Sequence, residues 1–222
     1  MTPLRSVTQD EVDTFWRDGV VCLRGIIDPE YVRSMAVPLA AMLGTPELAD
    51  LSAMGDALAA SGKNVLRDSE GEETKGRFVA GVDHWLTHSE FADFALRTCL
   101  PTVAAVILGS RQVSLWEDSV LAKEPGTAER TAWHQDLPYW PMEGSKIASA
   151  WISLDTLPAS ECLEYVRGTH HGVRYDGFNP RRVSEDPTLP YFGSEYPPLP
   201  NIEADRSAWD IVSWDITPGD II

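Results

Sequence analysis

The sequence predicts a mainly β domain, a barrel or jelly roll, with a layer of helices at its N-terminal end. Helix-capping and amphipathic patterns dominate residues 1–110. In residues 111–222, short apolar runs alternate with turn residues, which is typical of many short strands. A chain of 222 residues supports one substantial core and is marginal for two, so we expect residues 1–222 to form a single domain.

The first helix of the N-terminal part is marked at both ends. Thr8 and Glu11 form a capping-box pattern, and Gly19 marks the end of the helix. A second helix is predicted over 29–43, with a proline at its first position. The other predictions for this part are a short strand over 20–23, helices over 51–60, 89–98 and 101–108, and a surface loop over 61–76.

The second half contains the predicted strands. Four apolar runs bounded by turn residues carry this prediction: 113–121, 148–157, 162–166 and 211–214. Residues 172–208 are rich in proline, glycine and aromatic residues and follow no regular pattern. So long an irregular segment inside a compact domain is usually functional, and we expect it to cover a site as a lid.

Composition disfavours several classes of protein. The net charge is −16, so an anionic partner such as nucleic acid is not expected. No run of 18 apolar residues occurs and the N-terminus lacks a signal-peptide core, so we expect a cytoplasmic protein without a membrane partner. Cys22, Cys99 and Cys162 are far apart and odd in number, which indicates buried thiols.

His134 and Asp136 are the strongest candidates for chemistry. Residues two apart on an extended strand point to the same face, so the imidazole and the carboxylate would lie side by side. Such a pair supplies two of the three ligands in the 2-His-1-carboxylate triad of non-haem iron(II) oxygenases. The pattern H-x-D also arises by chance, and the alternative is a surface turn in which Asp136 hydrogen-bonds nearby backbone.

The surroundings of this pair resemble one enzyme family. His134-Gln135-Asp136-Leu137-Pro138-Tyr139 is followed by Ala150-Trp151, Glu161-Cys162-Leu163 and Gly168-Thr169-His170. Near the N-terminus stands Phe15-Trp16-Arg17-Asp18-Gly19-Val20-Val21. In order and spacing these motifs resemble the phytanoyl-CoA dioxygenase family over nearly the whole chain. The resemblance implies a double-stranded β-helix, that is, a cupin-like jelly roll, with helices packed around it.

The resemblance also implies roles for individual residues. His134 and Asp136 would be ligands of Fe(II), Trp151 would line the pocket of the co-substrate 2-oxoglutarate, and Ser119 would contact that co-substrate. O2 is the other co-substrate of the family. Its third ligand, a distal histidine, follows the turn that 218–222 matches, so we expect this histidine, a 2-oxoglutarate-binding arginine and the last strands beyond residue 222.

Some positions depart from the family pattern or compete as ligands. Glu161 stands where the family often has glycine and Arg167 where it often has proline, which would alter substrate contacts without removing the chemistry. His170 is expected to belong to a structural turn. His84 and His88 are interpreted as ordinary polar positions, because no H-E-x-x-H glutamate accompanies them.

The expected activity is oxidative decarboxylation of 2-oxoglutarate to succinate and CO2, coupled to hydroxylation of a small organic substrate. A carboxylate at Asp136 favours hydroxylation, because related halogenases carry a small residue there. Two alternatives stay open: a catalytically inactive or truncated jelly-roll ligand-binding protein, and a cupin-type metal enzyme that uses His170 or His171. Substrate identity and oligomeric state are not determined by the sequence. The aromatic side chains that would line the substrate cleft or pack in the barrel core are Trp116, Tyr139 and Trp140.

Overall fold

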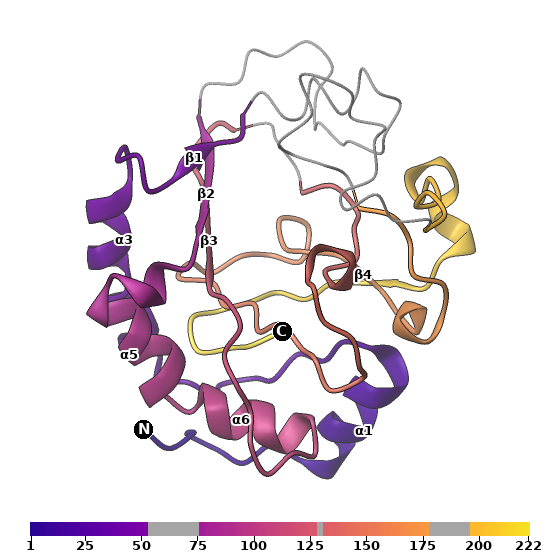
Figure 1. Ribbon diagram of the computed structural model, residues 1–222, viewed down its shortest axis with the longest axis horizontal. Helices are drawn as coiled ribbons and strands as arrows, with labels where there is room; N and C mark the ends of the chain where they lie inside the picture. The colour runs from indigo at the N-terminus through magenta and orange to yellow at the C-terminus, as the bar shows by residue number, and fades with distance from the viewer. Residues whose placement is uncertain (53–75, 128–130, 178–195) are drawn as a thin grey trace.

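Helices and two small antiparallel sheets make up the computed structural model, which describes residues 1–52, 76–127, 131–177 and 196–222. The helices are α1 (Gln9–Asp18), α2 (Pro29–Ser34), α3 (Ala36–Met42), α5 (Ser89–Arg97) and α6 (Leu100–Ile107), and the 3-10 helices are η1 (His84–Leu86), η2 (Leu137–Tyr139), η3 (Thr169–His171) and η4 (Glu203–Ala208). None of the described helices has the length and apolar character needed to cross a membrane. The α-helices follow one rim of the molecule, and the C-terminal segment lies at its centre (Figure 1).

Helix α1 forms as the capping pattern predicts. The amide of Glu11 donates to Thr8 Oγ1 over 3.3 Å, and the amide of Thr8 donates to Glu11 Oε2 over 2.8 Å. The helix ends at Gly19, whose φ of +77° is readily adopted only by glycine. A Cβ at Gly19 would also lie 2.3 Å from His170 Nδ1, so this position joins the end of α1 closely to η3.

The prediction of one helix over 29–43 is wrong, because the chain forms α2 and α3 with a break at Met35. Pro38 accounts for the break: it has no N–H to donate, and its ring would collide with the carbonyl of Ser34 in a continuous helix. The helices predicted over 89–98 and 101–108 are confirmed as α5 and α6. The helix predicted over 51–60 and the loop over 61–76 fall almost entirely outside the described residues.

The sheets contain shorter strands than the apolar runs predict. One sheet has the order β1 (Ala49–Asp50), β2 (Phe78–Val82), β3 (Ser119–Lys123), all antiparallel. The run over 113–121 is therefore a strand only from residue 119. Strand β2 was not predicted from the sequence. The second sheet pairs β4 (Tyr165–Val166) with β5 (Ile211–Val212).

A further antiparallel pairing, outside the two sheets, involves the C-terminal segment. Trp151 and Ile222 exchange backbone hydrogen bonds of 2.8 and 3.0 Å, and Leu157 and Ile216 exchange bonds of 2.9 and 2.8 Å. Both pairs share one register, so 151–157 and 216–222 run side by side in opposite directions. The run predicted over 148–157 is thus an extended partner of the C-terminal segment, although it is not a continuous strand.

Three extended segments form a layer between two hydrophobic clusters. Side chains alternate along 20–23: Val21 and Leu23 lie in the cluster under the helices, and Val20 and Cys22 lie in or against the other. Ile221 and Ile222 divide between the clusters in the same way, as do 151–152. The thiols of Cys99 and Cys162 are buried as predicted, and Cys22 is half-buried, with burial raising its pKa to about 11.

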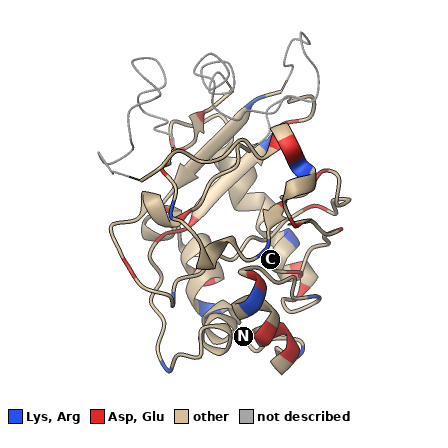
Figure 2. Ribbon diagram, turned by 90° about the vertical axis from the view of Figure 1, so that its right-hand side faces the viewer, with Lys and Arg blue, Asp and Glu red and all other residues tan. Residues whose placement is uncertain are grey.

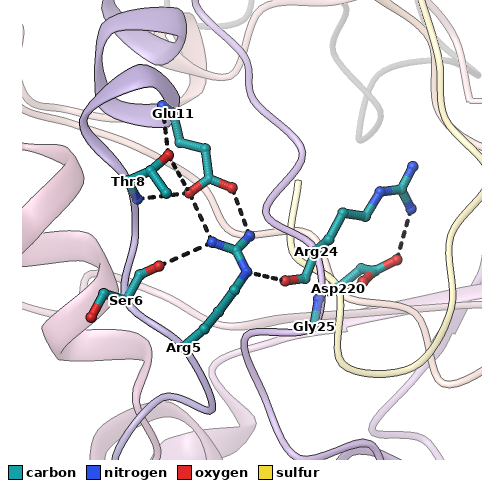
Figure 3. Close-up of polar contacts among 7 residues, drawn as sticks. All are labelled: Arg5, Ser6, Thr8, Glu11, Arg24, Gly25 and Asp220. Carbon is teal, nitrogen blue, oxygen red and sulfur yellow. Dashed lines mark hydrogen bonds and ion pairs between the residues drawn. The ribbon is translucent and has the colours of Figure 1, made fainter.

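The C-terminal turn is tied to the N-terminal segment by a buried carboxylate (Figure 3). Asp220 is 4% exposed and accepts hydrogen bonds of 2.8 Å from the amide of Gly25 and from Arg24 Nη1. The amide of Thr217 also donates to it over 3.2 Å. Arg5 extends the network, since its guanidinium donates to the carbonyl of Arg24 and to both carboxylate oxygens of Glu11.

We expect Asp220→Ala to lower the free energy of unfolding by about 2–4 kcal/mol, because the amides of Gly25 and Thr217 lose their acceptor and Arg24 loses its buried ion-pair partner. Urea unfolding of both proteins measures the difference. Asp210→Ala is the matched control: its carboxylate is 65% exposed and pairs with Arg167, so the change should stay within about 1 kcal/mol. Equal effects of the two substitutions would contradict the prediction.

The contribution of Asp220 should also depend on pH. Burial would raise the pKa of this carboxyl, but hydrogen bonds from Gly25, Arg24 and Thr217 outweigh burial and lower it. A folded-state pKa below the ordinary value of about 4 stabilises the protein above that pH. The stability difference between the native chain and Asp220→Ala should therefore be constant near neutrality and shrink as the pH falls below about 4. A difference that grew with acidification would contradict this assignment.

Candidate active site

His134 and Asp136 lie side by side, although not on a regular strand. Residues 131–136 form no strand, and Asp136 has helical φ and ψ because η2 begins directly after it. The prediction of a shared strand face is therefore wrong in its backbone, yet the side chains converge: His134 Nε2 lies 3.2 Å from Asp136 Oδ1. The side chains remain 34% and 46% exposed, so a ligand can reach them from solvent.

Hydrogen bonds orient the imidazole of His134. Its Nδ1 lies 2.7 Å from the carbonyl of Ala132, and since a carbonyl only accepts, Nδ1 carries a proton and Nε2 is left facing Asp136. This arrangement leaves Nε2 as the nitrogen available to a metal. Burial would lower the pKa of the imidazole, but the hydrogen bonds with Asp136 and Ala132 outweigh burial and raise it.

The carboxylate of Asp136 is held on its other side. Ser149 Oγ donates to Asp136 Oδ2 over 2.6 Å, which turns Oδ1 toward His134. The hydrogen bond with His134 lowers the pKa of Asp136; burial opposes this shift and Ser149 adds to it. Asp136 is therefore an anion, paired in space with a nitrogen donor. No pattern in the sequence identified Ser149, which lies 13 residues further along the chain.

Long-range hydrogen bonds anchor the segment that carries the pair. Gln135 Nε2 donates to the carbonyl of Val173 over 3.1 Å, and the amide of Tyr175 donates to Gln135 Oε1 over 2.8 Å. Trp133 Nε1 donates to Glu203 Oε1 over 2.7 Å. The described parts of the 172–208 segment are thus attached to the candidate site, and its role as a lid stays a prediction. Gln135 belongs to the H-Q-D motif, the one sequence signal that could have marked it.

A cleft opens beside His134. Burial raises the pKa of the Tyr165 phenol on its wall, and the charge of Asp136 contributes to the shift. Acidic and basic residues lie close together on this side of the molecule (Figure 2), and Arg206 of η4 pairs with Glu164 at 2.5 Å and with Glu203 at 2.8 Å. The residues that line the cleft are Asp18, Gly19, Val20, Trp133, His134, Gln135, Glu164, Tyr165, Val166, Thr169, His170, Tyr175, Leu199, Pro200, Ile202 and Trp209.

The two residues predicted to contact 2-oxoglutarate, Trp151 and Ser119, lie in different parts of the structure. Trp151 packs against the hydrophobic cluster of Val20 and Ile222, as does Tyr165, which also lines the cleft. Ser119 is exposed at the start of β3, where it pairs with Val82 of β2. The structure therefore brings His134 and Asp136 together, whereas Trp151 packs against the cluster of Val20 and is not among the described residues that line the cleft.

The remaining aromatic and histidine candidates differ in their exposure and in the residues that they contact. Trp116 is 52% exposed, so a core position is wrong for this residue. Tyr139 packs edge-on against His134, with ring centroids 6.2 Å apart. The rings of His170 and His171 lie 3.8 Å apart and are tilted by 39°, and the Nε2 atom of each lies 3.1 Å from the carbonyl of Trp16. Both histidines thus secure the end of α1, which matches the structural turn expected for His170.

The donor set of His134 and Asp136 fits a metal ion. Ligand atoms about 2.1 Å from one ion and at right angles to each other are about 3.0 Å apart, close to the observed 3.2 Å. One imidazole nitrogen and one carboxylate oxygen are two of the three donors of an iron facial triad. Within the described ranges, no further His, Cys, Asp or Glu joins this pair within 4.8 Å.

Comparisons with known proteins define the class. The family model "Phytanoyl-CoA dioxygenase" matches residues 15–222, so the chain belongs to this family. The family uses Fe(II), 2-oxoglutarate and O2. The chain is accordingly of the iron- and 2-oxoglutarate-dependent oxygenase type. None of the curated proteins matches the sequence.

Solved structures share the fold. SnoK, a non-haem α-ketoglutarate-dependent carbocyclase from nogalamycin biosynthesis, aligns with a TM-score of 0.62 at 19% identity, covering 99% of this chain and 75% of its own. The epimerase SnoN, solved in complex with Fe3+, α-ketoglutarate and nogalamycin RO, aligns with a TM-score of 0.58 at 18% identity, covering 96% of this chain and 72% of its own.

Replacing Ser149 with Ala should lower the affinity for Fe(II) about tenfold, because Asp136 loses the hydrogen bond that orients it as a ligand. Anaerobic titration of the chain with Fe(II) measures the affinity. Ser207→Ala serves as the control, since it removes a similar 2.6 Å hydrogen bond to the exposed Asp205 and should leave the affinity unchanged. Unaltered binding by Ser149→Ala would show that this hydrogen bond does not orient a ligand.

Proposed function

We propose that this chain is an Fe(II)- and 2-oxoglutarate-dependent dioxygenase with a jelly-roll core that hydroxylates a small organic substrate. The single observation that carries the proposal is the 3.2 Å approach of His134 Nε2 to Asp136 Oδ1 beside an open cleft. Family membership supports it independently. In the balanced reaction, 2-oxoglutarate, O2 and a C–H group of the substrate are converted to succinate, CO2 and a C–OH group.

The residues of the chain have distinct roles in this proposal. His134 and Asp136 would hold the iron, which supplies the redox chemistry when bound. Ala132 and Ser149 position these ligands through hydrogen bonds. We assign Trp151 to the 2-oxoglutarate pocket, supported by its packing against the same hydrophobic cluster as Tyr165, which lines the cleft.

Two further assignments rest on the family resemblance. Ser119 would be a second contact of 2-oxoglutarate. The resemblance, in which the turn motif falls on 218–222, also implies a histidine as the third iron ligand and an arginine that binds 2-oxoglutarate. The turn itself is firmly positioned, since Asp220 is buried and Ile222 pairs with Trp151.

The cleft indicates the character of the substrate. Its lining is largely aromatic and aliphatic, with Trp133, Tyr165, Tyr175 and Trp209 among its members, and Glu164 and Asp18 at its polar parts. Apolar walls with a few polar groups are typical of small-molecule sites. A small, partly apolar substrate therefore fits best, and nogalamycin RO, the ligand named with SnoN, is a useful first probe.

The test is release of succinate from 2-oxoglutarate in the presence of Fe(II), O2 and a panel of such substrates. His134→Ala and Asp136→Ala should each reduce turnover more than about 100-fold, whereas Asp210→Ala should not. A product that gains one oxygen atom supports hydroxylation. An isomeric or cyclised product would overturn hydroxylation in favour of the epimerase or carbocyclase outcome that SnoN and SnoK represent.

The ligand-binding alternative gives a different result in the same assay. A catalytically inactive protein would bind 2-oxoglutarate in a calorimetric titration, yet release no succinate with any member of the panel. Such an outcome would contradict the proposed enzyme function. Binding of 2-oxoglutarate would still support the assignment of a 2-oxoglutarate pocket.

A further inference from the structure

A second group of metal-ligating side chains lies outside the candidate active site. Glu47 lies between α3 and β1, His84 begins η1, and His88 caps the N-terminal end of α5. Each offers one ligand atom, and the three atoms lie within 4.8 Å of one another. The elements that carry them lie on the same side of the molecule in Figure 1.

His84 is the unusual member of this group. It is 4% exposed, and its Nε2 atom has no hydrogen-bond partner. An unsatisfied buried nitrogen costs roughly 1–3 kcal/mol, so its persistence calls for a compensating partner. A Cβ at Gly81 would lie 2.5 Å from this nitrogen and 2.6 Å from the carbonyl oxygen of Glu47, so the glycine leaves room for the ring against β2.

The other two members are already in contact. His88 Nε2 lies 2.8 Å from Glu47 Oε2, and their side chains are 29% and 49% exposed. The ring of His88 lies 6.2 Å from that of His84, and both pack near Phe91. The cluster thus combines one buried imidazole, one half-buried imidazole and one carboxylate that reaches solvent.

We propose that Glu47, His84 and His88 bind a divalent transition-metal ion, for which Zn2+ is the best match. Two imidazoles and a carboxylate form a three-ligand zinc donor set, with water in the fourth position. Ligand atoms about 2.1 Å from a tetrahedral ion are about 3.4 Å apart. The three ligand atoms now lie within 4.8 Å of one another, so movements of the side chains by about 1 Å would bring them to this separation. The ion would satisfy His84 Nε2 and displace any proton shared by His88 and Glu47.

The proposed ion would connect segments that are distant in the sequence. It joins the segment between α3 and β1 to the turn between β2 and α5. That turn is attached to β3, because the amides of Asp83 and Trp85 donate to the carbonyl and the carboxylate of Asp118, over 2.9 and 3.2 Å. Metal binding would therefore brace the start of β3 at Ser119, and it does not depend on the proposed enzyme function.

The experiment uses the full chain with His134→Ala and Asp136→Ala as background, so that the candidate iron site is removed. Zn2+ titration against a chromophoric chelator should show one bound equivalent, and Co2+ should give the visible absorption of a four-coordinate site. Glu47→Gln and His88→Gln, both at partly exposed positions, should each weaken Zn2+ binding by more than about tenfold, since even an outer partner of a ligand contributes that much.

Glu90→Gln is the matched control, because Glu90 lies in the first turn of α5, two residues from His88, and outside the cluster. It should bind Zn2+ as the background protein does. Zn2+ should also raise the melting temperature of the background protein and of Glu90→Gln, but not of His88→Gln. Absence of Zn2+ binding in the background, or equal binding by Glu47→Gln, His88→Gln and Glu90→Gln, would overturn the proposal.

Discussion

The buried carboxylate of Asp220 is the interaction on which the rest of the structure depends. By accepting hydrogen bonds from Gly25 and Arg24, it holds the C-terminal turn against the N-terminal segment. Ile221 then pairs with Leu23 on one side, and Ile222 pairs with Trp151 on the other. This places extended chain between two hydrophobic clusters, so each of these segments buries side chains on both faces. A carboxylate so deeply buried is tolerated only because its hydrogen bonds and its ion pair compensate for lost hydration.

This layer also determines where the candidate active site lies. Trp151 is fixed by its pairing with Ile222, and Ser149, two residues earlier, donates to Asp136. The position of the His134 and Asp136 pair therefore depends on the C-terminal turn through the backbone of 149–151. The cleft is bounded on its other side by the end of α1 and by η3, which the close approach of Gly19 and His170 brings together.

Two kinds of polar site coexist in this chain. At His134 and Asp136, the hydrogen bonds to the Ala132 carbonyl and from the Ser149 hydroxyl orient an imidazole and a carboxylate beside an open cleft, as a site that exchanges substrates requires. At Glu47, His84 and His88, a nitrogen is buried without a partner and the surroundings are helices and a strand end. The structural neighbours SnoK and SnoN are a carbocyclase and an epimerase on a shared fold, so the fold alone does not specify the reaction.

The sequence by itself determined the features that arise from local contacts, within one helical turn or between near neighbours in the chain. Thr8, Glu11 and Gly19 delimit α1, and His134 and Asp136 meet because one residue separates them, even though the predicted strand is missing. Only the tertiary structure decided that Ser149, Gln135 and Glu203 anchor this pair and that Glu47 lies beside His84 and His88. Such contacts join segments 13 to 70 residues apart. No local periodicity encodes them, because they arise only when burial of distant apolar faces brings those segments together.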